Sequence, residues 1–240
     1  MLAKGNTKLG NAIYSFNIPA LDTCPGKSAI CVILCYATRR RFKGGIVRAA
    51  HARNLDEAKA VGFAEKMIEE IKKKKPKVVR IHAAGDFFGI RYIRAWIKIV
   101  KACPNVAFYA YTRSWVMDML LGPIKELASL SNFDMWFSCD RAMGKPPKVR
   151  GIRSCYLAEN DEDKPRFKVN LVFREKRNTK IKKYGRYASQ VCPVEQGIDR
   201  RVKITCGKCS ICFDDAKHYA AILKEAREAA RNNTLTQISV

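Results

Sequence analysis

The sequence has few acidic residues and no long apolar run. Of its 240 residues, 22 are Asp or Glu and 46 are Lys or Arg, so the formal net charge is +24. No apolar run approaches the roughly 18 residues that a membrane helix needs. The first ten residues, MLAKGNTKLG, lack the apolar core of a secretory signal. We therefore predict a cytoplasmic protein without a membrane partner.

The excess of positive charge favours a polyanionic partner, nucleic acid first and a membrane surface second. We find no convincing amphipathic basic helix, which argues against the membrane, and no signature of a named nucleic-acid module. Two basic segments are the candidate contacts with DNA or RNA. The second mixes tyrosine with cations, which suits stacking on exposed bases, although a charged loop is the alternative. The candidates are Arg39, Arg40, Arg41, Lys180, Lys182, Lys183, Tyr184 and Arg186.

A convincing cluster of carboxylates is also missing, which disfavours a metal-dependent nuclease. Cysteine, in contrast, is abundant, with ten in the chain. Cys24, Cys31 and Cys35 lie within twelve residues and could form a disulfide knot, a metal site or a cluster of small core residues. A chain of this length can bury a core without crosslinks, and in a reducing compartment clustered thiols more often bind metal than pair.

A second set of cysteines lies near the C-terminus. Cys192 is followed by proline, and Cys206, Cys209 and Cys212 are separated by two residues each. This spacing is typical of ferredoxin-like iron–sulfur sites, whereas structural zinc sites usually divide their ligands into two pairs. We therefore expect two [4Fe–4S] clusters, one held by each set.

The first set has only three cysteines, so one iron of its cluster would be open to a substrate, a water or an outside ligand. Cys139 or Cys155 could close that position, and the sequence leaves this open. Cys103 is isolated and is expected to pack in the core, because free cysteine is among the most buried residue types.

The middle of the chain repeats a strand–helix pattern. Short apolar runs begin at residues 77, 105 and 132, and amphipathic helical patterns lie between them. With further strands at 12–20 and 167–174, this pattern predicts an α/β fold. We expect a partial parallel (βα) barrel with an iron–sulfur loop after the first strand. We place the barrel and first cluster in residues 1–145, and the remaining strand and a cysteine-rich C-terminal extension in 146–240.

Polar and thiol side chains follow each of the first four predicted strands. They are Thr23 and Cys24; His82, Gly85 and Asp86; Thr112 and Arg113; and Ser138, Cys139, Asp140 and Arg141. Parallel strands bring their carboxyl ends to one edge, where α/β folds carry their chemistry. We predict Asp86, Arg113 and His82 as catalytic residues. The alternatives are a helix cap for Asp86, charge neutralisation for Arg113 and a core position for His82.

Several motifs resemble the phage gene product 88 family over residues 6–141. They are "NTKLG", "FNIPALDTCPG", "CYA", "NL", "RIHAAGDFF" and "YTRSW". The C-terminal cysteines fit this resemblance too, and it implies a viral or mobile-element protein.

The layout is more distantly similar to radical S-adenosylmethionine enzymes. These carry a three-cysteine loop after the first strand of a partial barrel and an acidic glycine motif after the second. The resemblance implies S-adenosylmethionine as a cofactor, with Gly85 and Asp86 in place of the acidic motif and Tyr36 as the aromatic beside the cluster. The family usually separates its cysteines by three and then two residues, whereas here the gaps are six and three.

The leading expectation is a radical-S-adenosylmethionine-like iron–sulfur enzyme that acts on nucleic acid. The alternatives are a non-catalytic nucleic-acid-binding protein whose clusters are structural staples, and a structural zinc protein.

Overall fold

The computed structural model describes residues 1–6, 8–160, 162–174, 190–196 and 205–214. These residues form a mixed α/β fold around one seven-stranded sheet, with the strands in chain order from β1 to β7. β1 pairs antiparallel with β2, and all other neighbours are parallel. The strands are β1 (Ala3–Lys4), β2 (Ile13–Phe16), β3 (Val78–Ile81), β4 (Ala107–Thr112), β5 (Phe133–Cys139), β6 (Arg153–Ala158) and β7 (Leu171–Arg174).

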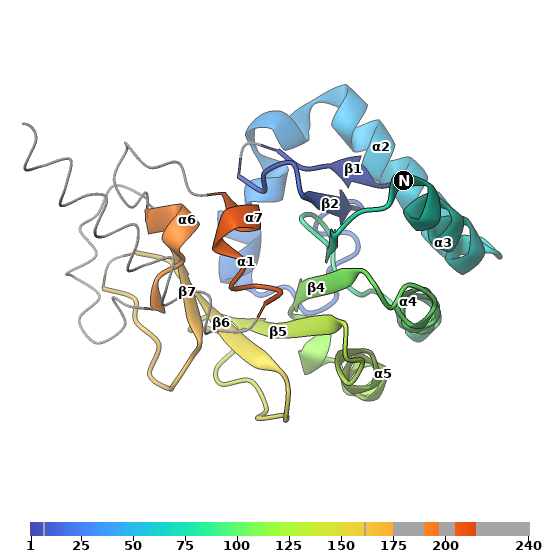
Figure 1. Ribbon diagram of the computed structural model, residues 1–240. Coiled ribbons are helices and arrows are strands. Elements are labelled where there is room, and N and C mark those ends of the chain that lie inside the picture. Colours follow the sequence, from blue (N-terminus) through green and yellow to red (C-terminus); the bar gives the residue numbers. More distant parts are fainter. Residues whose placement is uncertain (7, 161, 175–189, 197–204, 215–240) are drawn as a thin grey trace, which may run out of the picture.

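Helices cover one side of this sheet. α3, α4 and α5 lie along that side, and the short C-terminal helices α6 and α7 lie on the opposite side (Figure 1). The α-helices are α1 (Ala29–Leu34), α2 (Gly45–Lys59), α3 (Phe63–Lys74), α4 (Ile90–Ala102), α5 (Asp118–Ala128), α6 (Pro193–Gln196) and α7 (Cys206–Cys209). Three 3-10 turns are η1 (Tyr36–Thr38), η2 (Arg40–Lys43) and η3 (Ser114–Val116).

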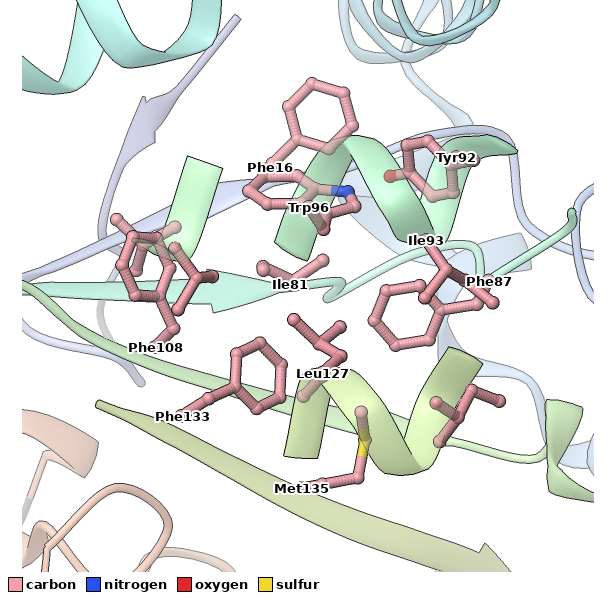
Figure 2. Close-up of a cluster of buried hydrophobic side chains, with 14 of the residues drawn as sticks. Phe16, Ile81, Phe87, Tyr92, Ile93, Trp96, Phe108, Leu127, Phe133 and Met135 are labelled. Atoms are coloured by element: carbon pink, nitrogen blue, oxygen red, sulfur yellow. The ribbon is translucent and has the colours of Figure 1, made fainter. Parts of the chain in front are cut away.

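The apolar periodicity of α4 explains how this helix contributes to the core between the sheet and the helices. Its apolar residues recur at helical spacing, so Ile93, Trp96 and Val100 form one stripe that is fully buried. The Trp96 ring meets Phe16 of β2 edge to face, with ring centroids 5.4 Å apart (Figure 2). Burying these side chains is the main contribution that holds the helices on the sheet.

The predicted central strands are confirmed as β3, β4 and β5, but the predicted total of five strands is too low. β1 has only two residues. β6 was missed because it contains Arg153 and Ser154 and lacks the continuous apolar run of a strand buried on both faces. The strand predicted at 167–174 is present as the shorter β7.

Asn54, with Glu57 three residues later, has the sequence appearance of a helix cap but does not start a helix. α2 begins nine residues earlier, at Gly45, and passes through that position. Asn54 is buried inside the fold, where its amide donates to the carbonyl oxygens of Asn17 at 2.9 Å and Met1 at 3.1 Å. A tertiary contact therefore accounts for a side chain that resembles a local cap.

The sheet is open, since β1 and β7 do not pair with each other among the described residues. Its second face carries two smaller clusters. One gathers Leu9, Ile13, Val78 and Tyr109, and the other gathers Trp136, Cys155, Leu171 and Cys192. Residues from the segment 205–214 pack against both clusters, so the C-terminal cysteines cover this face. Within the described ranges, every helix is too short or too polar to cross a bilayer.

Candidate functional site

A buried carboxylate connects two strand ends at the carboxyl edge of the sheet. Asp86 follows β3, is 5% exposed, and accepts hydrogen bonds from the Thr112 hydroxyl at 2.6 Å and the Arg113 N–H at 2.8 Å. The N–H of Phe87 is a third donor, at 2.7 Å. Burial raises the pKa of Asp86 above its ordinary value, although these hydrogen bonds oppose the shift.

A second carboxylate joins the next strand end to the cysteine loop. Asp140 follows β5 with no exposed side-chain surface, and its Oδ2 accepts from Arg113 Nη1 at 2.5 Å and from the Ser28 hydroxyl at 2.5 Å. The Ser28 hydroxyl oxygen in turn accepts from the N–H of Cys31 at 3.0 Å and caps α1. The path Arg113–Asp140–Ser28 therefore fixes the backbone that carries Cys31.

The three cysteines of the first set gather at this edge, and all three are partly exposed. Burial, followed by the neighbouring Asp86 carboxylate, raises the pKa of Cys24 to about 12, with smaller effects from Cys31 and Cys35. Burial also raises the pKa of Cys31, while the Arg113 guanidinium lowers it. Asp86 and Cys35 raise the pKa of both Cys24 and Cys31, so these groups belong to a single site.

Gly85 allows the loops of this edge to approach closely. Its φ is +89°, and a Cβ would lie 2.3 Å from Ile18 Cγ1 and 2.8 Å from Thr23 Oγ1. Only glycine can adopt this positive φ and also leave room for Ile18 and Thr23 without strain. The contacts of Gly85, predicted as a cofactor residue, are thus with the backbone and side chains of the loop that leads to Cys24.

Tyr36 lies beside Cys35 with 54% of its surface exposed. Its hydroxyl donates to the carbonyl oxygen of Ala83 and accepts from Arg80 Nη2 at 3.3 Å. The phenol is therefore anchored between η1 and β3, and its ring stays accessible at the edge.

The structure places His82 in the core and away from the thiols. It is 3% exposed, its Nε2 lies 2.7 Å from the Tyr92 hydroxyl, and its ring packs on Phe87 and Tyr92. Burial, followed by nearby Arg80, lowers the pKa of His82 to about 3. This environment favours the core position that the sequence left open, because the imidazole stays neutral and has no path to a ligand.

The C-terminal cysteines form a separate set on the second face of the sheet. The N–H groups of Cys206 and Gly207 donate to the carbonyl oxygens of Lys8 and Leu9, at 2.8 and 2.9 Å. The partly buried Tyr111 hydroxyl donates to Cys212 Sγ at 2.7 Å. Burial, together with the nearby Cys206 and Cys209, raises the pKa of Cys212 to about 12, so these three thiols are neighbours.

The backbone of this C-terminal turn is held by two side chains from the sheet. Trp136 Nε1 donates to the carbonyl oxygen of Cys212 at 3.0 Å, and Arg153 Nη1 donates to that of Ile211 at 2.7 Å. The Arg153 guanidinium also lies 4.1 Å from the centroid of the Trp136 ring, within cation–π distance. Cys192 packs in the adjoining cluster, where its N–H donates to Val172 O at 2.8 Å.

The remaining cysteines pack inside the fold. Cys139 belongs to the core under the helices, and its Sγ donates to the carbonyl oxygen of Cys155 at 3.2 Å. Cys155 faces the other side and shares a buried cluster with Cys192. Cys103 is 6% exposed in the main core, as expected from its isolation.

The donor types suit a thiolate-bound metal. All ten cysteines lie in the described residues and are free thiols, and buried thiols give up their protons when a metal binds. Among the described residues, however, no group of three or more His, Cys, Asp and Glu side chains stands ready at metal-binding spacing. Side-chain rearrangement would thus accompany metal binding at either set.

Most of the candidate nucleic-acid residues lie outside the residues that the structure describes. Lys180, Lys182, Lys183, Tyr184 and Arg186 lie beyond the described residues, as do the side chains of Arg40 and Arg41. Arg39 is exposed, and its guanidinium donates to the carbonyl oxygen of Ile33.

Sequence reasoning did not assign Ser28, Arg80, Tyr111, Trp136 or Arg153 to a site. Ser28 carried a usable signal, since a serine three residues before Cys31 is a typical helix cap. The others lie on strands β3 to β6 and differ from ordinary strand residues only through distant contacts, with Tyr36 for Arg80 and with the C-terminal segment for the other three.

Comparison with known proteins identifies the family of this chain. The family model described as "Gene product 88" matches residues 1–234. The Gene 88 protein of Mycobacterium phage D29 is 32% identical over 151 residues, which cover 56% of this chain and 61% of that protein. The Gene 88 protein of Mycobacterium phage L5 is 30% identical over 151 residues, covering 56% and 62%.

These alignments span about three-fifths of the relatives' own length. No solved structure matches the chain. Both relatives are mycobacteriophage proteins, which supports the expectation of a viral or mobile-element protein. With a family model that matches almost its whole length, the chain belongs to the gene product 88 family.

Proposed function

We propose that the protein is an iron–sulfur enzyme of the radical-S-adenosylmethionine type that acts on nucleic acid. The observation that carries the proposal is the gathering of Cys24, Cys31 and Cys35 at the carboxyl edge of a parallel sheet, beside Asp86 and Asp140. Ligands of parallel α/β folds bind at this edge.

The order and direction of the strands in the sheet support the same assignment. Strands β2 to β7 follow one another in chain order and are all parallel, which is the order in a (βα) barrel. We take the sheet as a partial barrel, with the first cysteine set in the loop after its first parallel strand.

In this proposal the first set holds one [4Fe–4S] cluster and the C-terminal set holds a second. A cluster held by Cys24, Cys31 and Cys35 would leave one iron open to an exchangeable ligand and would supply one-electron chemistry there. Ser28 and Asp140 orient the backbone of Cys31, and the exposed ring of Tyr36 lies beside Cys35, where an adenine could stack.

Asp86 has a limited capacity for a further ligand. A carboxylate has about four acceptor sites, and Asp86 already receives three hydrogen bonds from the protein. One site is therefore left for the amino group of S-adenosylmethionine, while the other three are taken by Phe87, Thr112 and Arg113.

A non-catalytic protein is the second candidate, and the C-terminal set favours it. Tyr111, Trp136 and Arg153 bind the turn around Cys212 to the sheet, which is the arrangement of a structural staple. A metal there, either an iron–sulfur cluster or zinc, would fix the segment that covers the second face.

The experiment that separates the two candidates is electron paramagnetic resonance of anaerobically reconstituted, reduced protein. The Cys206→Ser/Cys209→Ser variant removes the C-terminal site, so the remaining signal comes from the first set. The enzyme candidate predicts that S-adenosylmethionine changes this signal, and that a Cys24→Ser/Cys31→Ser/Cys35→Ser variant gives no such response. A first-set signal that ignores the cofactor would leave the non-catalytic candidate.

A further inference from the structure

The outward face of α4 carries a row of four cations. Arg91, Arg94, Lys98 and Lys101 are all exposed, and the helix contains no acidic residue. At a rise of about 1.5 Å per residue, successive members lie about 4.5, 6 and 4.5 Å apart along the axis. The row therefore extends about 15 Å in a straight line.

The opposite side of α4 is buried in the core, and this fixes the direction in which the four cations point. Tyr92, Trp96, Ile99 and Val100 have at most 2% exposed surface and pack in the main core. The helix cannot rotate without exposing these side chains, so the four cations form a rigid surface.

Two of the four cations have acidic neighbours on adjacent helices. Lys98 pairs with Glu65 of α3, and Lys101 Nζ lies 4.0 Å from the Glu126 carboxylate of α5. Arg91 and Arg94 form no ion pair or side-chain hydrogen bond within the described part of the chain. The uncompensated charge is thus concentrated in the first turn and a half of α4.

A groove of about 580 Å³ runs beside the row. It lies where α4 adjoins α5 and is lined by Arg94, Ile97, Lys98, Lys101, Ala102 and Glu126. In Figure 1 the two helices lie next to each other at the outer side of the sheet, away from α6 and α7.

We propose that this face of α4 is the docking surface for the phosphate backbone of duplex nucleic acid. The guanidinium groups of Arg91 and Arg94 can each bind a phosphate through two hydrogen bonds. The inference rests on the part of the proposed function that gives the protein a nucleic-acid partner.

The absence of exposed aromatic rings on α4 selects the duplex over a single strand. Proteins that bind single strands stack bases on aromatic side chains. Here Tyr92 and Trp96 are buried, and the exposed large apolar side chains of the described residues lie elsewhere in the chain. A surface that offers charge alone fits a backbone whose bases are already stacked, and it reads no sequence.

The row also leads toward the candidate site. α4 starts directly after the loop that contains Asp86, and Arg91 is five residues from that carboxylate. The N-terminal end of the row, at Arg91, therefore points a bound duplex toward the edge that carries Cys24, Cys31 and Cys35.

The test measures binding of a mixed-sequence 20-base-pair duplex, and of one of its strands, across a salt titration by fluorescence anisotropy. The Arg91→Gln/Arg94→Gln variant should reduce the slope of log K against log salt for the duplex by about 1.8, since each phosphate contact contributes about 0.9. The matched Arg48→Gln/Arg53→Gln variant removes the same charge from exposed positions of α2 and should leave the slope nearly unchanged. Unfolding temperatures identical to that of the parent protein verify that both variants are folded.

Equal losses in the two variants would overturn the placement on α4, as would tighter binding of the single strand that the α4 variant does not weaken. If the parent protein binds neither probe at low salt, the nucleic-acid part of the proposed function fails as well.

Discussion

Removing the Arg113 guanidinium should destabilise the protein strongly, because it leaves the Asp140 carboxylate without its cation. Arg113→Met keeps much of the side-chain volume and deletes only the charge and its donors. Asp140 has no exposed side-chain surface and Arg113 has 8%, so water cannot replace the lost partner. Breaking a buried ion pair from one side costs about 3–5 kcal/mol.

The hydrogen bonds that remain place the expected loss at the lower end of this range. Asp140 keeps the Ser28 hydroxyl and the N–H groups of Ala142 and Met143 as donors. We therefore expect about 3 kcal/mol for Arg113→Met. The double variant with Asp140→Asn should lose less than the sum of the two single variants, because it leaves no lone buried charge.

Urea unfolding followed by tryptophan fluorescence measures this loss. The control is Lys66→Met, which breaks the exposed pair with Glu57 and should cost less than about 1 kcal/mol. If Arg113→Met costs no more than the control, the ion pair does not organise the edge of the sheet, and the account of how Cys31 is held is wrong.

Three further predictions follow from the same contacts. Because the pKa of His82 is about 3 in the fold and about 6.5 when unfolded, only the unfolded chain gains a proton between pH 7 and 5. Stability should fall by about 2 kcal/mol over that interval, and urea unfolding of His82→Gln at both pH values should lack this part of the loss. Gly85→Ala should cost about 2–4 kcal/mol in urea unfolding, since its Cβ would meet Ile18 at a positive φ, whereas Gly122→Ala in open space on α5 should be neutral or stabilising. Tyr111→Phe should lower the thermal unfolding temperature by a few degrees, since it deletes a partly buried hydrogen bond to Cys212, and an unchanged temperature would show that this contact does not stabilise the fold.

The sequence predicted the central sheet well, because its strands are encoded locally. β3, β4 and β5 are rich in apolar and aromatic residues, and helical patterns separate them, so they can be recognised without knowledge of their partners. β6 is different, because its Arg153 is compatible with a strand only through contacts with Trp136, Asp134 and the C-terminal turn. Those contacts are distant in sequence, so local patterns do not reveal them.

The candidate site also has one part that the sequence predicts and another part that depends on distant contacts. That Asp86, Arg113 and Asp140 meet at one edge follows from parallel strands and was predictable. It was not predictable which of the neighbouring polar side chains point toward this edge. Cys139 follows the alternation of β5 into the core, whereas His82 lies on the core side although Val79 and Ile81 of β3 already face it, so simple alternation does not predict its place. Asn54 is a similar case, because it has the sequence appearance of a helix cap although its amide is buried inside the fold.

The most direct test of the central claim is the metal and sulfide content of the anaerobically purified protein. Two four-iron clusters predict about eight iron and eight sulfide per chain. Cys206→Ser/Cys209→Ser should retain about half of each, as should the triple serine variant of Cys24, Cys31 and Cys35. Stoichiometric zinc without sulfide, or iron that neither set of substitutions removes, would contradict the assignment of the cysteines to iron–sulfur clusters.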